Sequence, residues 1–405
     1  MPKIKIENFG AIKNCDIDIK KVTLFIGNQG TGKSTIAKLI STFMWIEKAL
    51  VRGDITAKWL LSNNNKHKKA FENIFMKYHL MENYTKNNTK INYEGDIYRI
   101  IYENEKFEIK QKQNKYSLPQ IMYIPAERNF ISNVKKTRDL KLFSHSLMDF
   151  LTEFNNAKQE LKTLKLPINN AELEYDKLND IVNIKGSDYK VKLTESASGF
   201  QSIIPLFLVT EFLTNSIKKR ISDKVMSVEE QERFKKMFLE IQENNELTDE
   251  QKRIAISGIA AKFNKTSFIN IVEEPEQNLY PEAQWELLKK LLEYNNLNEG
   301  NKLIMTTHSP YMINFLSIAI QANMLQNKIK KAKNKNELLE KIKKIIDFNS
   351  TISENDLIVY QLKNGKSLKL SSVYGIPSDD NYLNNMLDEG NDKFGTLLEI
   401  EEEIQ

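Results

Sequence analysis

Eight residues near the start of the chain have the composition of a phosphate-binding loop. They read G-x-x-x-x-G-K-S, in the order Gly27, Asn28, Gln29, Gly30, Thr31, Gly32, Lys33 and Ser34. Three glycines let successive backbone N–H groups point inward and form an anion site at the positive end of the next helix. In such loops the lysine reaches the β- and γ-phosphates of a nucleotide and the serine hydroxyl binds Mg²⁺. We therefore predict that this loop, with Thr35, binds ATP and Mg²⁺.

The residues on either side give the loop its required strand, loop and helix context. Val22–Ile26 is an apolar run, and Thr35–Trp45 has the pattern of a helix. Ile4–Ile19 alternates between apolar and polar residues, which predicts two short strands before the loop strand. The alternative, a glycine-rich turn before an ordinary helix, does not account for a match at all eight positions and at both flanks.

Two carboxylates follow a second apolar run. Phe268–Val272 suits a strand that is buried on both faces, and Glu273 and Glu274 come directly after it. A nucleotide hydrolase needs such a pair opposite its phosphate loop, one carboxylate at the metal and the next near the attacking water. We expect Glu273 to bind the metal and Glu274 to act as the base. The alternative is a solvated loop rich in glutamate.

A histidine follows the next apolar run. Leu303–Thr306 is predicted to be a parallel strand, connected to the previous one by a helix over Pro281–Tyr294. His308 then stands at the carboxyl end of a strand, where ligands bind in open α/β sheets, and imidazole can donate a hydrogen bond to a γ-phosphate oxygen. We expect His308 to contact the γ-phosphate. The alternative is an ordinary polar side chain with a partner inside the protein.

A fourth segment, Glu195–Ser202, precedes the apolar helical run Ile203–Leu213. Its small residues stand at the start of a helix, where backbone N–H groups can bind an anion. Ser198 and Gly199 are the small residues at this helix start that could bind an anion. The alternative is a serine that caps the helix without any ligand.

The rest of the chain divides by pattern. Three strand-like runs over Lys90–Lys112 predict a small antiparallel layer, and Ile121–Ile124 reads as a buried strand. Asp139–Leu164 has helical periodicity. Ile217–Lys265 is strongly charged with helical spacing, and Asn244–Thr248 breaks it. We interpret this last stretch as a helical insert in two parts.

These patterns predict an α/β protein with a mixed sheet, an antiparallel layer and an inserted helical subdomain. We place an N-terminal ATPase lobe at 1–130, the helical subdomain at 131–193 and a C-terminal ATPase lobe at 194–320. The helical insert at 217–265 belongs to the last lobe. A tail of helices and strands follows at 321–405, in which Leu357–Leu362 is strand-like and Asp379, Asp380 and Asp388 are surface residues.

Composition narrows the class of protein. The 405 residues are 40% hydrophobic and 28% charged, as in globular proteins, and no apolar run approaches the ~20 residues that a membrane span needs. We expect neither a membrane partner nor a secretory signal. The single cysteine excludes an internal disulfide framework and favours a reducing cytoplasm. The net charge of +5 permits contact with DNA, and the lysine-dense stretch Lys328–Lys344 supports it weakly, because such runs are usually solvated helix faces.

Together and in this order, the four segments resemble the ABC-type ATPases of the RecF, SMC and OLD kind. Residues 273–281 read E-E-P-E-Q-N-L-Y-P and look like the extended Walker B motif of the OLD branch, and 307–310 match its switch-histidine motif. Ser198 and Gly199 with Gln201 resemble a degenerate ABC signature in which Phe200 replaces the usual second glycine, and the resemblance implies that these three residues bind nucleotide. The resemblance covers about residues 1–320 and implies an ATPase in which two copies enclose ATP, as a homodimer or higher oligomer.

A narrower resemblance rests on residues 123–130, which read Y-I-P-A-E-R-N-F. They occupy the place of the Q-loop but contain no glutamine, so Glu127 or Arg128 becomes the candidate sensor of metal or phosphate. The phrase is similar to that of stand-alone bacterial ATPases of phage-defence operons, including the ATPase of PARIS-type systems. This resemblance implies a regulatory engine for a separate effector, such as a nuclease-type toxin.

A second function of a different class fits the same motifs. RecF-like and SMC-like ATPases clamp DNA in repair or in chromosome maintenance, so DNA is the alternative partner. The tail after residue 355 is too short for the Toprim nuclease domain that follows the ATPase in full-length OLD nucleases. A transporter ATPase is less consistent with the chain, because both the signature and the Q-loop are altered.

Overall fold

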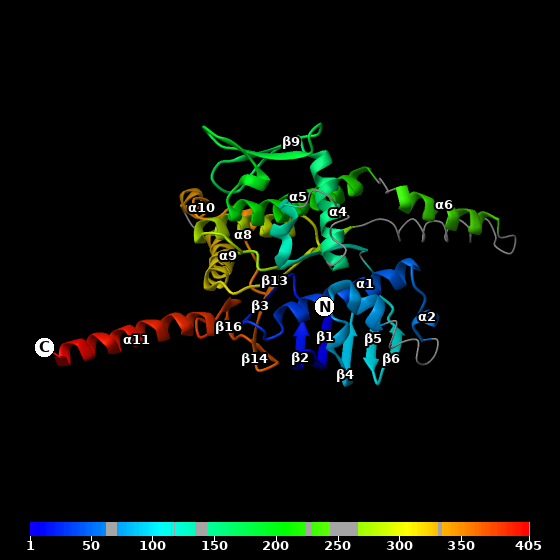
Figure 1. Cartoon of the computed structure of the whole chain (residues 1–405), viewed down its shortest axis with the longest axis horizontal. Helices are drawn as coiled ribbons and strands as arrows, with labels where there is room; N and C mark the ends of the chain where they lie inside the picture. The colour runs from blue at the N-terminus through cyan, green and yellow to red at the C-terminus, as the bar shows by residue number, and fades with distance from the viewer. Residues whose placement is uncertain are drawn as a thin grey trace.

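A mixed sheet of 11 strands organises the molecule (Figure 1). The computed structural model describes residues 1–61, 71–114, 116, 118–133, 144–223, 228–243, 266–330 and 334–404. Over these residues the strand order of the sheet is β6-β5-β4-β1-β2-β15-β14-β3-β13-β12-β7. The described chain also contains a sheet of four strands and one of two.

Five neighbouring strands pair in parallel and form the centre of the large sheet. They are β14 (Leu357–Lys363), β3 (Val22–Gly27), β13 (Lys302–Thr306), β12 (Ser267–Glu273) and β7 (Pro119–Ile124). The prediction of parallel strands at 268–272 and 303–306, with a helix between them, is confirmed. Because parallel strands end at the same edge, the loops after β3, β12 and β13 meet there.

Alternation along these strands gives the sheet two buried faces. In β3, Leu24 and Ile26 belong to one hydrophobic core and Phe25 belongs to the other. The second core is covered by α1 (Lys33–Arg52). The first is covered by helices α4 (His145–Glu160), α5 (Ser198–Asp223), α8 (Pro281–Asn296) and α9 (Pro310–Ile329). Burial on both sides explains why the central strands read as continuous apolar runs.

The antiparallel layer is confirmed and extends the same sheet. Its strands are β1 (Lys3–Phe9), β2 (Ile12–Asp18), β4 (Thr85–Glu94), β5 (Tyr98–Glu103) and β6 (Lys106–Gln111). Buried Glu47 attaches α1 to this layer, because its carboxylate accepts hydrogen bonds from the Tyr93 hydroxyl and from the Ile97 N–H at 2.8 and 2.7 Å. The phosphate-loop helix therefore has a fixed position on the layer.

The segment 131–193 is not wholly helical. Its helix is α4, and after it the strands β8 (Thr163–Lys165), β9 (Glu172–Asp176), β10 (Ile181–Lys185) and β11 (Lys190–Lys192) form an antiparallel sheet. The prediction of a helical subdomain is wrong for these strands. The helical spacing ends with α4, and the strands that follow, of three to five residues each, are too short to give a strong alternating pattern.

The charged insert is described in part. Helix α5 passes through residue 217 and ends at Asp223, and α6 (Val228–Gln242) follows. The predicted break at 244–248 lies outside the described residues. Within α5, Ser198–Lys218 is long and apolar enough to cross a membrane, contrary to the expectation that no such run exists. However, 67% of this stretch is buried inside the fold, which is the behaviour of a core helix.

The tail contributes to the core. The strand predicted at 357–362 is β14, and it pairs with β3 through six residue pairs that begin at Leu357 and Val22. The predicted boundary between 320 and 321 also falls within α9. The tail is therefore part of the ATPase fold, because a central parallel strand cannot be removed without exposing both cores. Its other elements are α10 (Lys335–Lys343), β15 (Lys366–Lys369), β16 (Ser372–Val373), β17 (Ile376–Pro377) and α11 (Tyr382–Ile404).

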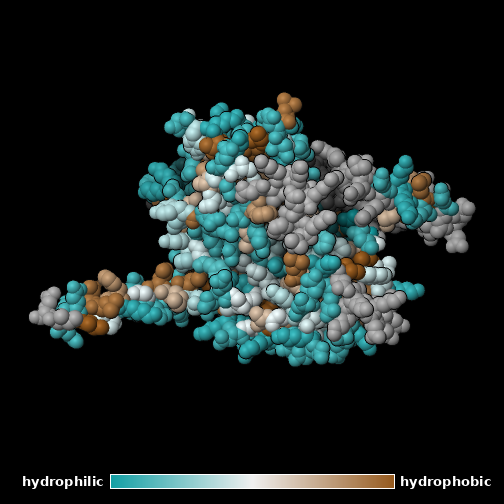
Figure 2. Space-filling view, in the orientation of Figure 1, coloured by the Kyte–Doolittle hydropathy of each residue, from teal (hydrophilic) through white to brown (hydrophobic). Residues whose placement is uncertain are grey.

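Helix α11 extends away from the body of the molecule (Figure 1) and carries apolar side chains along its length (Figure 2). These side chains are more than one-third exposed and comprise Met386, Leu387, Phe394, Leu397, Leu398 and Ile400.

Short helical segments connect the remaining elements: α2 (Ala57–Leu61), η1 (Phe71–Met76), η2 (Lys77–His79), η3 (Glu82–Tyr84), η4 (Ala126–Asn133), η6 (Leu193–Glu195) and η7 (Phe348–Ser350).

Two truncations test whether β14 belongs to the core. A chain that ends at residue 355 loses β14, and we expect it to lose cooperative unfolding and ATP binding because β3 and both cores become exposed. A chain that ends at residue 381 loses only α11 and should keep both properties. Circular dichroism during thermal unfolding and titration with a fluorescent ATP analogue measure the difference. Equal behaviour of the two truncations would contradict this role of β14.

Candidate functional site

The phosphate loop joins β3 to α1 and is built on three glycines. Gly27, Gly30 and Gly32 have φ angles of 140°, 73° and 100°, which residues with a Cβ rarely adopt. A Cβ on Gly27 would also lie 2.5 Å from the carbonyl oxygen of Leu362 in β14. The loop therefore depends on its own glycines and on close packing against the tail strand.

Lys33 lies over this loop. Its Nζ donates hydrogen bonds to the carbonyl oxygens of Gly27 and Asn28, at 2.8 and 2.9 Å. Burial lowers the pKa of Lys33 to about 8, and three nearby carboxylates oppose this shift: Glu274, Glu276 and Glu273. A buried ammonium group whose hydrogen-bond partners are neutral carbonyls is well suited to receive an anionic phosphate.

The other loop residues shape its turn. The Thr31 hydroxyl donates to the carbonyl oxygen of Asn28 at 2.8 Å, and the Gln29 N–H donates to Asn28 Oδ1 at the same distance. Ser34 and Thr35 lie in the first turn of α1, where backbone N–H groups have no partner within the helix. The sequence-predicted loop residues thus lie together at the positive end of α1.

Glu274 follows β12 in the left-handed backbone region, with a φ of 44°. Two hydrogen bonds hold this unfavourable conformation, one from the Glu274 N–H to the Thr306 carbonyl at 2.9 Å and one from Arg128 Nη2 to the Glu274 carbonyl at 2.6 Å. The side chain lies beside His308, whose Nε2 is 3.4 Å from Glu274 Oε1. The sequence-predicted base and switch histidine are therefore neighbours.

The environment keeps His308 neutral near pH 7. Burial and the charge of Lys33 lower the pKa of His308, and Glu274 opposes them. Both side chains remain about one-third accessible, at 37% for His308 and 33% for Glu274. A neutral, accessible imidazole can donate one hydrogen bond to a ligand.

Glu273 is buried behind Glu274. Its Oε1 accepts a hydrogen bond from the Tyr123 hydroxyl, and its Oε2 accepts one from the Ala126 N–H at 3.2 Å. Each carboxylate oxygen can accept further hydrogen bonds or bind a cation. Tyr123 was not identified from the sequence, because a tyrosine within an apolar strand gives no signal of a polar role.

Arg128 is fully buried, and its guanidinium contacts main-chain carbonyls rather than the phosphate loop. Nη1 donates to the carbonyl oxygens of Glu273 and Pro125 at 2.6 and 3.3 Å, and Nε donates to that of Ser202 at 3.1 Å. Burial lowers the pKa of Arg128 to about 10. The expectation that Arg128 senses metal or phosphate is therefore corrected, since its donors hold the turn after β7, the end of β12 and α5 together. Glu127 is exposed to solvent.

The signature-like residues form the first turn of α5. A Cβ on Gly199 would lie 2.9 Å from the carbonyl oxygen of Asn278, so a glycine is needed for close packing at this position. Gln201 donates to the carbonyl oxygen of Ser196 at 2.9 Å, which uses its amide within the chain. Ser198 is exposed. A nucleotide-binding role of Ser198, Gly199 and Gln201 stays a prediction.

Two lysines of the lysine-dense stretch form ion pairs within α10. Lys341 pairs with Glu337 at 2.5 Å and Lys343 pairs with Glu340 at 3.2 Å, while residues 331–333 lie outside the described chain. Such pairs are typical of a solvated helix face. This arrangement gives little support to a DNA-binding surface on α10.

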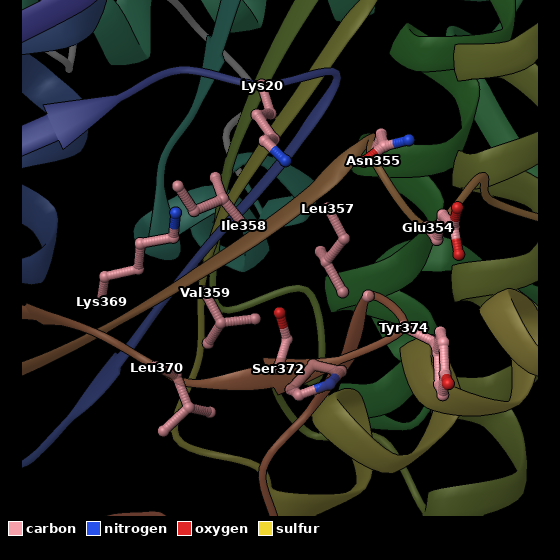
Figure 3. A pocket seen from close by; sticks show the side chains of 12 residues that line it. Lys20, Glu354, Asn355, Leu357, Ile358, Val359, Lys369, Leu370, Ser372 and Tyr374 are labelled. Atoms are coloured by element: carbon pink, nitrogen blue, oxygen red, sulfur yellow. The ribbon is translucent and has the colours of Figure 1, made fainter.

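A separate hollow lies at the opposite edge of the sheet. It has a volume of about 310 Å³ and is bounded by Lys20, Glu354, Leu357, Lys369 and Tyr374, among others (Figure 3). Leu357 pairs with the first residue of β3, whereas the phosphate loop follows the last one. This hollow is therefore not the nucleotide site.

The residues around the phosphate loop fit ATP and a hard metal ion. The glycine loop provides N–H donors, and Ser34, Glu273 and Glu274 carry oxygen ligands of the type that Mg²⁺ binds. Across the described ranges, no group of three or more histidine, cysteine, aspartate or glutamate side chains could hold a metal alone. Mg²⁺ commonly takes one or two carboxylates together with phosphate oxygens, so the nucleotide would complete its coordination.

Fold and site together define a P-loop nucleotide hydrolase. A family model described as the AAA ATPase domain matches residues 1–58 and 54–313, and the chain belongs to this family. The chain is therefore an ATPase, as its motifs predict, and the predicted α/β fold with a mixed sheet and an antiparallel layer is confirmed. No match was found among curated protein sequences.

Several solved structures are similar to the chain at low identity. The SMC head domain from Thermotoga maritima is 12% identical, with a TM-score of 0.37 over 92% of this chain and 98% of the other. A Pyrococcus furiosus Smc head domain, solved with the C-terminal domain of ScpA, is 11% identical, with a TM-score of 0.33 over 92% and 97%. The dimeric ATP-binding cassette MJ0796 bound to ADP and Pi is 12% identical, with a TM-score of 0.25 over 91% and 100%.

Lys33→Ala tests the phosphate loop. Removing the ammonium group should weaken ATP binding by about 10- to 100-fold, because hydrogen bonds to charged groups contribute about 1.5–3 kcal/mol each. The fold should remain, since the lysine contacts only the loop. Isothermal titration with a non-hydrolysable ATP analogue measures the affinity, and the exposed Lys58→Ala serves as the control. An unchanged affinity would refute the assignment of Lys33.

Arg128→Ala tests the contact that holds the site. The substitution leaves buried carbonyl groups without a donor and should lower the free energy of unfolding by about 3 kcal/mol. Turnover should also fall, because Glu274 loses one of the bonds that fix its backbone. Urea denaturation and steady-state ATPase assays measure the two effects. The partly exposed Arg99→Ala should change stability by no more than about 0.5 kcal/mol; a similarly small effect at Arg128 would exclude this role.

Proposed function

We propose that the chain hydrolyses ATP with Lys33 on the phosphates, Glu274 as the general base and His308 at the γ-phosphate. The observation that carries this proposal is the 3.4 Å contact between Glu274 and His308, at the sheet edge that also carries the phosphate loop. Ser34 and Glu273 would hold Mg²⁺, which neutralises charge on the transferred phosphoryl group when it is bound. The carboxylate of Glu274 would orient and polarise the attacking water.

Glu274→Gln separates binding from hydrolysis. The amide keeps the shape of the side chain but removes the base, so turnover should fall by about 100- to 10,000-fold while ATP affinity stays close to that of the wild type. Single-turnover release of phosphate and a binding titration measure the two quantities. The exposed Glu282→Gln provides a matched control. Turnover at the wild-type rate would remove Glu274 from this role.

The active form in this proposal is a self-assembly in which two copies enclose ATP. The first turn of α5 supports it, because Ser198 is exposed and Ser198 and Gly199 offer helix N–H groups that can face the nucleotide of a second copy. Hydrolysis would remove the phosphate contact of His308 and loosen the assembly. ATP-dependent dimerisation of the Glu274→Gln variant, measured by analytical ultracentrifugation, is the direct test.

The proposed biological role is a sensor and regulatory engine for a separate effector in bacterial anti-phage defence. The phrase at 123–130 supports it through its similarity to defence ATPases. Helix α11 offers a docking element, since its exposed apolar side chains lie among seven acidic residues and one lysine: Asp388, Glu389, Asp392, Lys393, Glu399, Glu401, Glu402 and Glu403. This chemistry fits an effector, a nuclease-type toxin, with a basic surface around an apolar groove.

The proposed role predicts that the chain alone does not cleave nucleic acid. The purified protein with ATP and Mg²⁺ should leave plasmid DNA and RNA intact, and so should Glu274→Gln. A toxin-like protein encoded beside it should co-purify with the full chain and be lost from a chain that ends at residue 381, whose ATPase activity persists. Cleavage by the single chain would overturn the proposal. ATP-dependent retention of DNA without an effector would favour the DNA-clamping alternative.

A further inference from the structure

A third carboxylate, Glu276, lies in the loop after β12. Its Oε1 accepts two hydrogen bonds of 2.7 Å, one from the Thr307 hydroxyl and one from the backbone N–H of His308. These bonds connect the loop that carries Glu274 to the segment that carries His308. In the described chain, the side chain of Glu276 thus links the segment of Glu274 to the segment of His308, the two proposed catalytic residues.

The connection is enclosed and leaves one oxygen free. Glu276 Oε2 is buried and has no hydrogen-bond partner among the described residues. Burial raises the pKa of the Glu276 carboxyl, and the amide and hydroxyl donors at Oε1 oppose that shift. The Glu276 carboxylate therefore has neutral hydrogen-bond donors as partners and forms no surface ion pair with the residues that the structure describes. Its two short bonds are the contacts that offset the cost of its burial.

The bonds act on the backbone of His308. Thr307 is anchored on its other side, because its N–H donates to the carbonyl oxygen of Phe25 in β3 at 3.0 Å. In the described chain, the His308 N–H donates to Glu276, while the next residue, Ser309, donates from its N–H to the Thr307 hydroxyl at 2.9 Å and from its own hydroxyl to Gln284 Oε1 at 2.7 Å. Loss of Glu276 would remove the bond at the His308 N–H between these two anchored neighbours, so that the imidazole could move away from Glu274.

We infer that Glu276 is a positioning residue that fixes His308 beside Glu274 and couples the switch segment to the Walker B loop. It acts through its Oε1 as a hydrogen-bond acceptor. A glutamine at this position keeps an oxygen acceptor and should preserve the connection, whereas a leucine of similar size cannot. The inference rests on the proposed role of His308.

The test compares Glu276→Leu, Glu276→Gln and the exposed control Glu282→Leu. We expect Glu276→Leu to lower kcat by about 100-fold, the cost of a small displacement of a catalytic group, with an unchanged Kd for a non-hydrolysable ATP analogue. Glu276→Gln and Glu282→Leu should retain kcat. The imidazole NMR signal of His308, one of four histidines, should shift in Glu276→Leu and not in Glu276→Gln. Thr307→Val, which removes one of the two donors, provides a second test if the leucine variant does not fold.

A double substitution identifies the route of the effect. If Glu276 acts through His308, Glu276→Leu combined with His308→Ala should be no slower than His308→Ala alone. Additive losses, wild-type turnover of Glu276→Leu, loss of nucleotide binding, or a glutamine variant as slow as the leucine variant would each overturn the inference. Unchanged turnover of His308→Ala would instead show that the proposed role of His308 is wrong.

Discussion

The site depends on one buried guanidinium. Arg128 donates to the carbonyl oxygens of Glu273 and Glu274, each at 2.6 Å, and reaches Ser202 in α5 as well. These are main-chain contacts, so they fix the path of the backbone while leaving the two glutamate side chains available. A buried charged group is stable only when its hydrogen-bond donors have acceptors. For Arg128, two of these acceptors are the carbonyl groups of Glu273 and Glu274, the residues that must be held in position. Catalytic geometry and the stability of the fold therefore share the same bonds.

A second layer of contacts surrounds the Walker B carboxylates. Tyr123 donates to Glu273 from β7, and the ring of His79 packs against Tyr123 with 4.6 Å between ring centroids. His79 is buried, and burial lowers its pKa to about 3, so it packs as a neutral ring. Residues between α1 and the antiparallel layer thus contact the active-site strand. This region lies outside the motifs, yet it supports them.

Much of the site at the carboxyl ends of the parallel strands could be predicted, because each of its motifs is a short run of consecutive residues. The loop at 27–34 and the apolar runs before Glu273 and His308 each occupy a few consecutive residues, and parallel strands necessarily bring their ends together. The roles of Arg128 and Glu276 could not be predicted in this way, because most of their partners are in distant segments and all but the Thr307 hydroxyl are backbone groups. The short strands β8 to β11 were not predicted for another reason, since segments of three to five residues carry too little periodicity to distinguish a strand from a continuing helix.

The position of β14 determines the order in which the chain can fold during synthesis. The first parallel strand, β3 (Val22–Gly27), leaves the ribosome long before its neighbour on one side, β14 (Leu357–Lys363). Until residues 357–363 emerge, the apolar edge of β3 lacks a partner and Gly27 lacks its cover. A nascent chain with an open, hydrophobic strand edge is prone to aggregate, so chaperones become relevant to this protein. Nucleotide can then stabilise the loop only after residues 357–363 have been made.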